Sequence, residues 1–225
     1  KDMPVTRIEQ SLQGRTSGVR VTTNSGQPGA ASQVRIRGTT TIGSSDPLYV
    51  VDGIIIGGGI DYLSQGDIES IEVLKDAASA AIYGARGANG VIIITTKKGK
   101  VGKPILNYNS YYGVQNPRRK LSLLNATEYA TLLNEASAAA GESIRFEDPQ
   151  SLGEGTDWQD AVFQEDAPIQ NHDVSLSVAN EVSNYYVSFS YFEQEGIVAS
   201  DDSRYQRMTA RFNSSHKITD RLTFG

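Results

Sequence analysis

The chain has 225 residues, and its 21 lysine and arginine residues against 26 aspartate and glutamate residues give a formal net charge of −5. A chain of this length can bury a sizeable core in a single domain or in a pair of small ones, and its acidic balance argues against a nucleic-acid binder that relies on a strongly basic face. Because the sequence contains no cysteine, disulfide scaffolds, cysteine-ligated metal sites and thiol catalysis are excluded.

Neither a membrane-spanning helix nor an export signal is expected within these residues. The longest aliphatic runs are residues 54–56 and 91–94, far short of the about 20 apolar residues that a spanning helix needs. The first residues lack a basic segment followed by an apolar stretch, which is the pattern of an export signal.

Up to residue 103 the sequence predicts a compact mixed unit of helices and strands. Apolar residues at helical spacing predict a short helix over residues 5–12, and small residues predict another over 77–83, ending at Gly84. Between and after them, strands are expected at residues 19–23, 34–36, 48–51, 71–74 and 91–96. Asp52-Gly53 and the three glycines from Gly57 mark turns or loops.

From Pro104 onward the pattern changes to alternation of apolar and polar residues over longer stretches. The first stretch shows it clearly, because Leu106, Tyr108 and Tyr112 fall on even positions, whereas Asn107 and Asn109 point the other way. The same two-residue period predicts further strands at residues 174–178, 185–191, 208–212 and 222–224. Each of these strands should have one apolar and one polar side.

The connections between these strands alternate between long and short. The first is a long segment, residues 115–171, with a helix that begins at Asn125, where Glu128 completes a capping box, and ends at Gly141. Short and longer connections then follow in turn. Such asymmetry is typical of a transmembrane β-barrel. The alternation alone also fits a soluble antiparallel sheet whose apolar side packs on a core.

Several motifs of the first hundred residues resemble one known family. In chain order they are VRIRG at residues 34–38, PLYVVDG at 47–53, IESIEVLKD at 68–76 and AASAAIYGARGANGVIIITTK at 77–97. This series resembles the plug domain of TonB-dependent outer-membrane transporters, and in detail the SusC/RagA branch found in Bacteroidetes. The match covers about residues 5–100, and two later stretches, 156–159 and 170–172, resemble the early barrel of the same branch.

The resemblance implies an α+β plug domain over residues 1–103, followed over 104–225 by the first antiparallel strands of a transmembrane β-barrel. In the family this barrel has about 22 strands, and the plug fills its lumen. Only about five strands fit in this sequence, and a spanning sheet must close on itself, so the chain is expected to be an N-terminal fragment. A leader, a segment that contacts TonB and an extra N-terminal domain are expected before Lys1.

The resemblance also implies a function without covalent chemistry, catalytic residues, metal or cofactor. The whole protein is expected to import a bulky polar nutrient, an oligosaccharide or a peptide, across the bacterial outer membrane. Its expected partners are TonB, a SusD-like surface lipoprotein, outer-membrane lipid and the substrate, and no nucleic acid. Residues 115–171 should face the exterior and are a candidate contact for the lipoprotein.

Two groups of plug residues are candidate sites. Polar side chains in the loops between plug strands should face the substrate, or else form solvated turns: Thr40, Ser44, Asp46, Asp61 and Tyr62. A second set should form a charge latch between plug and barrel wall, or else static ion pairs: Arg35, Arg37, Glu72 and Arg86. The resemblance suggests that the plug arginines face carboxylates on the barrel interior.

Other readings of the sequence find less support. Gly84, Gly87 and Gly90 lack the order of a dinucleotide-binding loop or a P-loop. The only histidines, His172 and His216, lie far apart without a metal-binding context. A hydrolase lacks any recognisable pair of acidic residues. The main alternative is a soluble surface adhesin or ligand-binding module with a β-rich C-terminal half.

Overall fold

The computed structural model describes residues 7–14, 16–23, 25–36, 38, 45–76, 80–199, 203–219 and 221–225. The described residues fall into two compact units. The first unit lies within residues 1–113, 169–194 and 204–225, and the second lies within residues 114–168 and 195–203.

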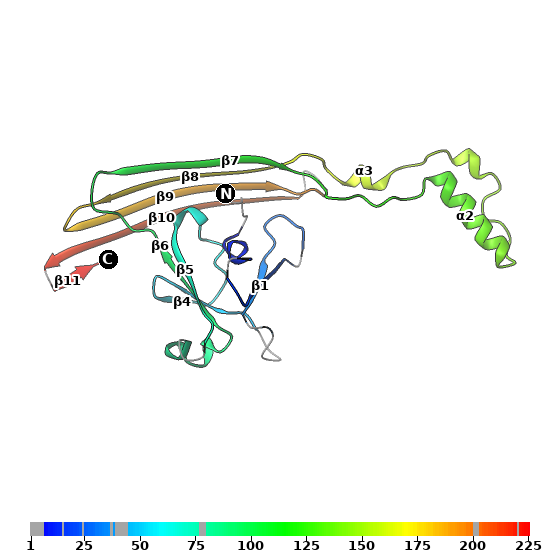
Figure 1. Ribbon diagram of the computed structural model, residues 1–225. Coiled ribbons are helices and arrows are strands. Elements are labelled where there is room, and N and C mark those ends of the chain that lie inside the picture. The colour runs from blue at the N-terminus through cyan, green and yellow to red at the C-terminus, as the bar shows by residue number, and fades with distance from the viewer. Residues whose placement is uncertain are drawn as a thin grey trace. The chain divides into compact units, whose positions relative to one another are not determined.

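The N-terminal part of the first unit contains a two-stranded sheet, a four-stranded sheet and short 3₁₀ helices (Figure 1). Its elements are η1 (Ile8–Leu12), β1 (Val19–Thr23), β2 (Ser32–Ile36), β3 (Leu48–Val51), β4 (Ile54–Ile56), η2 (Gln65–Asp67), β5 (Ile68–Leu74), η3 (Ala81–Gly87) and β6 (Val91–Thr96). Strands β1 and β2 pair antiparallel. The other four follow the order β4-β3-β6-β5, with β3 and β6 parallel. All five strands expected from the sequence in this part are therefore confirmed.

Three local expectations need correction. The helix expected over residues 5–12 is the 3₁₀ helix η1, which begins at Ile8; residues 5 and 6 lie outside the described part. Strand β4 was not predicted, because three consecutive isoleucines show neither a two-residue nor a helical period. The helix expected over residues 77–83 is instead the 3₁₀ helix η3, which begins at Ala81; residues 77–79 lie outside the described part. Gly84 has φ +62° and ψ −152°, outside the helical region, so the helical path is interrupted there.

The turn between β3 and β4 follows directly from local sequence. Asp52 and Gly53 form a two-residue connection, since Val51 pairs with Ile54. Both turn residues have positive φ, +50° and +86°, as a type I′ hairpin turn requires. Asp-Gly is a preferred sequence for this turn, so the predicted turn is confirmed, and the carboxylate of Asp52 is held in a defined place.

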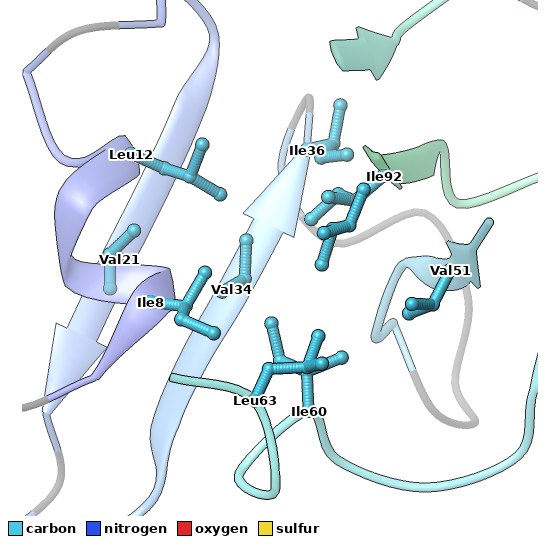
Figure 2. Packing of buried hydrophobic residues seen from close by; sticks show 10 residues of the cluster. Ile8, Leu12, Val21, Val34, Ile36, Val51, Ile60, Leu63 and Ile92 are labelled. Atoms are coloured by element: carbon cyan, nitrogen blue, oxygen red, sulfur yellow. The ribbon is translucent and has the colours of Figure 1, made fainter. Parts of the chain in front are cut away.

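The larger apolar core of the N-terminal part is formed by side chains of η1, of the β1–β2 pair and of the four-stranded sheet. Figure 2 shows Ile8 and Leu12 of η1 beside Val21 of β1 and Val34 of β2. The buried cluster is completed by residues of β2, β3, β6 and the loop before η2: Ile36, Val51, Ile60, Leu63, Ile92 and Ile94. Residues far apart in the sequence thus bury their side chains together, which removes apolar area from water and stabilises the fold.

The C-terminal sheet has five strands in the order β11-β10-β9-β8-β7, as Figure 1 shows. The strands are β7 (Ile105–Gln115), β8 (Ala167–Ala179), β9 (Ser183–Glu195), β10 (Arg204–Thr219) and β11 (Leu222–Phe224). The pairs β8–β9 and β10–β11 are antiparallel. All five predicted strands are confirmed, but β8, β9 and β10 are longer than the alternation indicated, because polar residues occupy their ends.

The two faces of the C-terminal sheet differ in chemistry and in exposure. On β9, Tyr185, Val187 and Phe189 are exposed, whereas the alternate residues from Tyr186 to Phe192 are buried. The exposed face also carries large apolar residues of the neighbouring strands: Leu106, Tyr108, Tyr112, Val174, Leu176, Met208 and Phe212. The polar residues that alternate with them face the N-terminal part. This arrangement is the reverse of a soluble sheet, whose apolar face packs on a core.

The second unit contains three short helices: α2 (Ala126–Ala139), η4 (Pro149–Leu152) and α3 (Trp158–Val162). The predicted capping box is present, since Asn125 accepts a hydrogen bond from the Glu128 N–H and the Glu128 carboxylate accepts one from the Asn125 N–H. The boundary expected at residue 171 lies inside β8, which begins at Ala167. Across the described residues, no helix combines the length and apolar character needed to cross a membrane.

Candidate functional site

A cavity of about 560 Å³ lies at one end of the four-stranded sheet. Strands β3 and β6 are parallel, so both begin at this end, next to the loop that follows β4 and to η3. The lining combines Gly57–Gly59, where the chain has no side chains, with charged and aromatic residues: Arg7, Glu9, Asp46, Tyr49, Asp61 and Arg86. The topology therefore brings segments far apart in the sequence to a single polar cavity.

Charges of both signs surround this cavity. Arg7 is nearly buried and forms an ion pair with Asp61, whose side chain is half exposed; it also donates to the Gly29 carbonyl. Burial raises the pKa of Glu9 above its usual range, and its own backbone N–H and Arg7 offset only part of that effect. Burial also raises the pKa of Tyr49, and the carboxylates of Glu9, Asp46 and Asp61 add to this shift. Such a lining suits a polar ligand better than an apolar one.

The residues predicted to face the substrate do not all lie together. Asp46 and Asp61 line the cavity. Tyr62 lies in a different environment, where burial raises the pKa of its hydroxyl and the charges of Arg211 and Asp52 act on it. Thr40 and Ser44 lie outside the described residues. Whether any of these side chains contacts substrate stays a prediction.

The residues predicted to form a charge latch are dispersed. Arg86 is exposed and lines the same cavity as Asp46 and Asp61, whereas Glu72 is exposed on β5. Arg35 stands opposite Arg20 in the β1–β2 pair, and Arg37 lies outside the described residues. The latch that these residues were expected to form stays a prediction.

An ion pair joins the N-terminal part to the C-terminal sheet, but its charges are placed the other way round from the expected latch, which had its arginines in the plug. The carboxylate belongs to Asp52 in the β3–β4 turn, and the guanidinium belongs to Arg211 of β10, with an N–O distance of 2.7 Å. Thr96, at the end of β6, donates to Asp52 from its backbone N–H at 2.8 Å and from its hydroxyl at 2.6 Å. Arg211 also donates to the Thr96 hydroxyl oxygen at 2.6 Å. We call Asp52, Thr96 and Arg211 the clamp.

Burial acts to raise the pKa of Asp52, but the hydrogen bonds from Thr96 and the charge of Arg211 outweigh it and hold that pKa below its usual range. Sequence reasoning did not find the clamp, because Asp52 and Arg211 are 159 residues apart. The one local signal was the Asp-Gly turn, which fixes the position of Asp52 but not its partner.

Further hydrogen bonds add to the contact between the same two parts. The Gly99 N–H donates to the Asn184 side-chain oxygen at 2.7 Å, and the Asn184 amide donates back to the Gly99 carbonyl at 2.6 Å. We call this pair the exit joint, because the chain leaves the N-terminal part here. Tyr186 donates to Asp67 at 3.1 Å, and Ser64 donates to Asp173 at 2.9 Å. Among the described residues, no group of three or more His, Asp or Glu side chains is placed to hold a metal ion.

Comparisons with known proteins agree with this fold. Residues 1–91 match the family model of the TonB-dependent Receptor Plug Domain. TonB-dependent receptor P26 of Formosa agariphila is 43% identical over 228 residues, which cover 99% of this chain and 23% of the relative. TonB-dependent receptor SusC of Bacteroides thetaiotaomicron is 38% identical over 219 residues, which cover 92% of this chain and 21% of the relative.

A solved structure of the RagAB peptide importer in its closed-closed state superposes with a TM-score of 0.82 at 32% identity, covering 98% of this chain and 28% of the importer chain. Fold and sequence together therefore define a plug domain of the TonB-dependent receptors, followed by antiparallel strands. The chain belongs to the SusC/RagA-type TonB-dependent transporters, and the expectations for its family and fold class are confirmed. It spans between 21% and 28% of the length of these relatives.

Proposed function

We propose that this chain forms the plug and the first wall strands of a bacterial outer-membrane transporter that imports a bulky polar nutrient. The cargo class is an oligosaccharide or a peptide, and energy arrives through TonB. The plug closes the barrel lumen until that energy moves it. In this proposal the protein carries out no covalent chemistry and needs no cofactor.

The exposed apolar face of the C-terminal sheet is the observation that carries this proposal. Leu106, Tyr108 and Tyr112 are 70%, 61% and 71% exposed, while the polar face of the same sheet packs on the plug. A contiguous apolar face of this size is costly in water and stable in lipid. A soluble adhesin, the alternative function, has no use for a sheet oriented in this way.

The plug cavity is the proposed place where substrate meets the plug from the lumen side. Asp46 and Asp61 line it with acceptors, and Arg86 lines it with donors. Thr40, Ser44 and Tyr62 complete the proposed substrate-facing set. The similarity to the RagAB peptide importer supports a peptide as one candidate cargo.

The charge latch is proposed for the part of the barrel wall that lies beyond this chain. Arg35, Arg37 and Arg86 would pair there with carboxylates on the barrel interior, and Glu72 with a cation. Buried charges at such an interface need partners.

A SusD-like surface lipoprotein is the proposed external partner. The segment 115–171 would face the exterior and contact it. Leu121, Leu123 and Trp158 of this segment are exposed, and exposed large apolar side chains favour a protein contact.

Two measurements on the full-length receptor in its bacterium test this function. The receptor should fractionate with the outer membrane and require detergent for extraction. Uptake of labelled oligosaccharides or peptides should fall when the gene is deleted and when a protonophore removes the energy source. A receptor found monodisperse in plain buffer would contradict the proposal and favour the adhesin.

A further inference from the structure

We call the C-terminal sheet of β7 to β11 the wall. We propose that the plug separates from the wall at the clamp of Asp52, Thr96 and Arg211, while the exit joint between Gly99 and Asn184 stays closed. This inference rests on the proposed function, since it assumes that the plug moves. It goes further by naming which contact opens and which contact holds.

The clamp is built so that its plug half survives separation. Asp52 accepts two hydrogen bonds from Thr96 and donates its own N–H to the Ile94 carbonyl at 3.0 Å. None of these three bonds involves the wall. Removal of the Arg211 guanidinium therefore leaves the Asp52 carboxylate with polar partners and the turn intact, so the contact can break without unfolding the plug.

Solvent access makes this contact separable. The side chains of Arg211 and Asp52 are 21% and 25% exposed. Each charge can therefore gain water as soon as the pair parts, whereas a fully buried charge would be stranded at a high cost. An ion pair that solvent reaches in part is also weakened by salt, so the salt dependence of the contact can be measured.

The exit joint has the opposite character. Both of its hydrogen bonds are between neutral groups, so neither salt nor moderate pH change weakens them directly. Gly99 is also closely surrounded, because a Cβ atom at this position would lie 2.6 Å from the Val178 carbonyl oxygen. The next residue is held as well, since the Lys100 N–H donates to Ser177 at 3.1 Å.

The chain between the two contacts is long enough for the clamp to open alone. Thr96 and Gly99 are three residues apart, which allows a separation of about 10 Å in extended chain. An ion pair is lost once its atoms part beyond about 4 Å. The plug can therefore leave β10 at Thr96 while Gly99 keeps its place on β9.

Single-cysteine labelling in the full-length receptor tests this inference. In outer-membrane vesicles, Thr209→Cys reports on the clamp, because Thr209 lies between Arg207 and Arg211 on the inward side of β10 and its hydroxyl is buried. Ser177→Cys, in a separate receptor, reports on the exit joint. The measured quantity is the rate of reaction with a maleimide.

Arg211→Gln should raise the labelling rate of the clamp reporter by about tenfold or more, since one partner of a partly buried ion pair is removed. About 1 M salt should raise the parent rate toward that of the variant and leave the variant rate unchanged. The reporter at the exit joint should react slowly both in the parent receptor and in the Arg211→Gln variant. The matched control is Arg207→Gln, which removes an arginine that donates to the Asp61 carbonyl at 3.3 Å and should leave the salt response unchanged.

Two results would overturn the inference. One is a clamp reporter that responds to Arg211→Gln no more than to Arg207→Gln. The other is a joint reporter that becomes labelled as fast as the clamp reporter, which would mean that the plug leaves at both places. Labelling needs no cargo, so failure here is distinct from failure of the uptake and fractionation tests of the proposed function.

Discussion

Substitution of Gly99 by alanine should weaken the attachment of the plug to the wall. An added Cβ would lie 2.6 Å from the Val178 carbonyl oxygen, 2.7 Å from the Asn184 side-chain oxygen and 2.7 Å from the Tyr185 carbonyl oxygen. Two of these three atoms belong to backbone that is fixed in the β8–β9 ladder. The methyl group can therefore be accommodated only if the chain at Gly99 moves away from the strands.

The size of the effect follows from what this movement breaks. Both hydrogen bonds of the exit joint are lost or stretched, at about 1 kcal/mol each, and residual crowding adds about 1 kcal/mol. We expect a total loss of about 2–4 kcal/mol in the free energy of unfolding. Asn184→Ala, which removes the hydrogen bonds without adding crowding, should cost about half as much.

Urea unfolding of the full-length receptor in detergent micelles, followed by the fluorescence of a dye attached to the plug, measures this difference. Gly58→Ala is the matched control, because a Cβ at Gly58 would meet no atom within 4 Å. If Gly99→Ala and Gly58→Ala unfold at the same urea concentration, the close packing at the exit joint does not exist and the reasoning is wrong.

Three further predictions concern the wall, the plug core and the clamp. Phe189→Arg should destabilise the receptor in lipid bilayers by about 2–4 kcal/mol, because it places a charge on the apolar face; equal urea resistance of variant and parent in vesicles would contradict a lipid-facing position. Ile92→Ala should cost about 2–5 kcal/mol in unfolding experiments, because Ile92 is fully buried, whereas the more exposed Ile55→Ala should cost less than about 1 kcal/mol. The hydrogen bonds from Thr96 and the charge of Arg211 hold the folded-state pKa of Asp52 below its ordinary value. Its contribution to stability should therefore be present at neutral pH and disappear as the pH falls through that lowered pKa. Unfolding curves of the parent and Asp52→Asn should accordingly converge in acid, and a difference that is constant with pH would refute this assignment.

Local sequence chemistry was enough to predict most elements of the fold. The Asp52-Gly53 turn follows from the positive φ angles that such a turn requires. The helix that begins after Asn125 follows from its capping box, and the wall strands follow from a period of two residues. These features depend on residues close in sequence, whose preferences act before any distant contact forms.

The same local rules did not predict the ends of the wall strands or the strand β4. The polar residues from Gln170 to His172 at the start of β8 interrupt the apolar period, and their strand conformation is supported by cross-strand pairing with β9. The three isoleucines of β4 show no period at all, and their pairing with β3 is what makes them a strand.

The sequence by itself determined the order of turns and strands, the existence of a sheet with one apolar side, and the family to which the chain belongs. The tertiary structure alone decided that the apolar side is the exposed one, that Arg86 shares a cavity with Asp46 and Asp61, and that Asp52 and Arg211 form the ion pair between plug and wall. The physical reason is that alternation specifies two different faces but not their surroundings. Likewise, a charged side chain carries no information about a partner 159 residues away until the chain has folded.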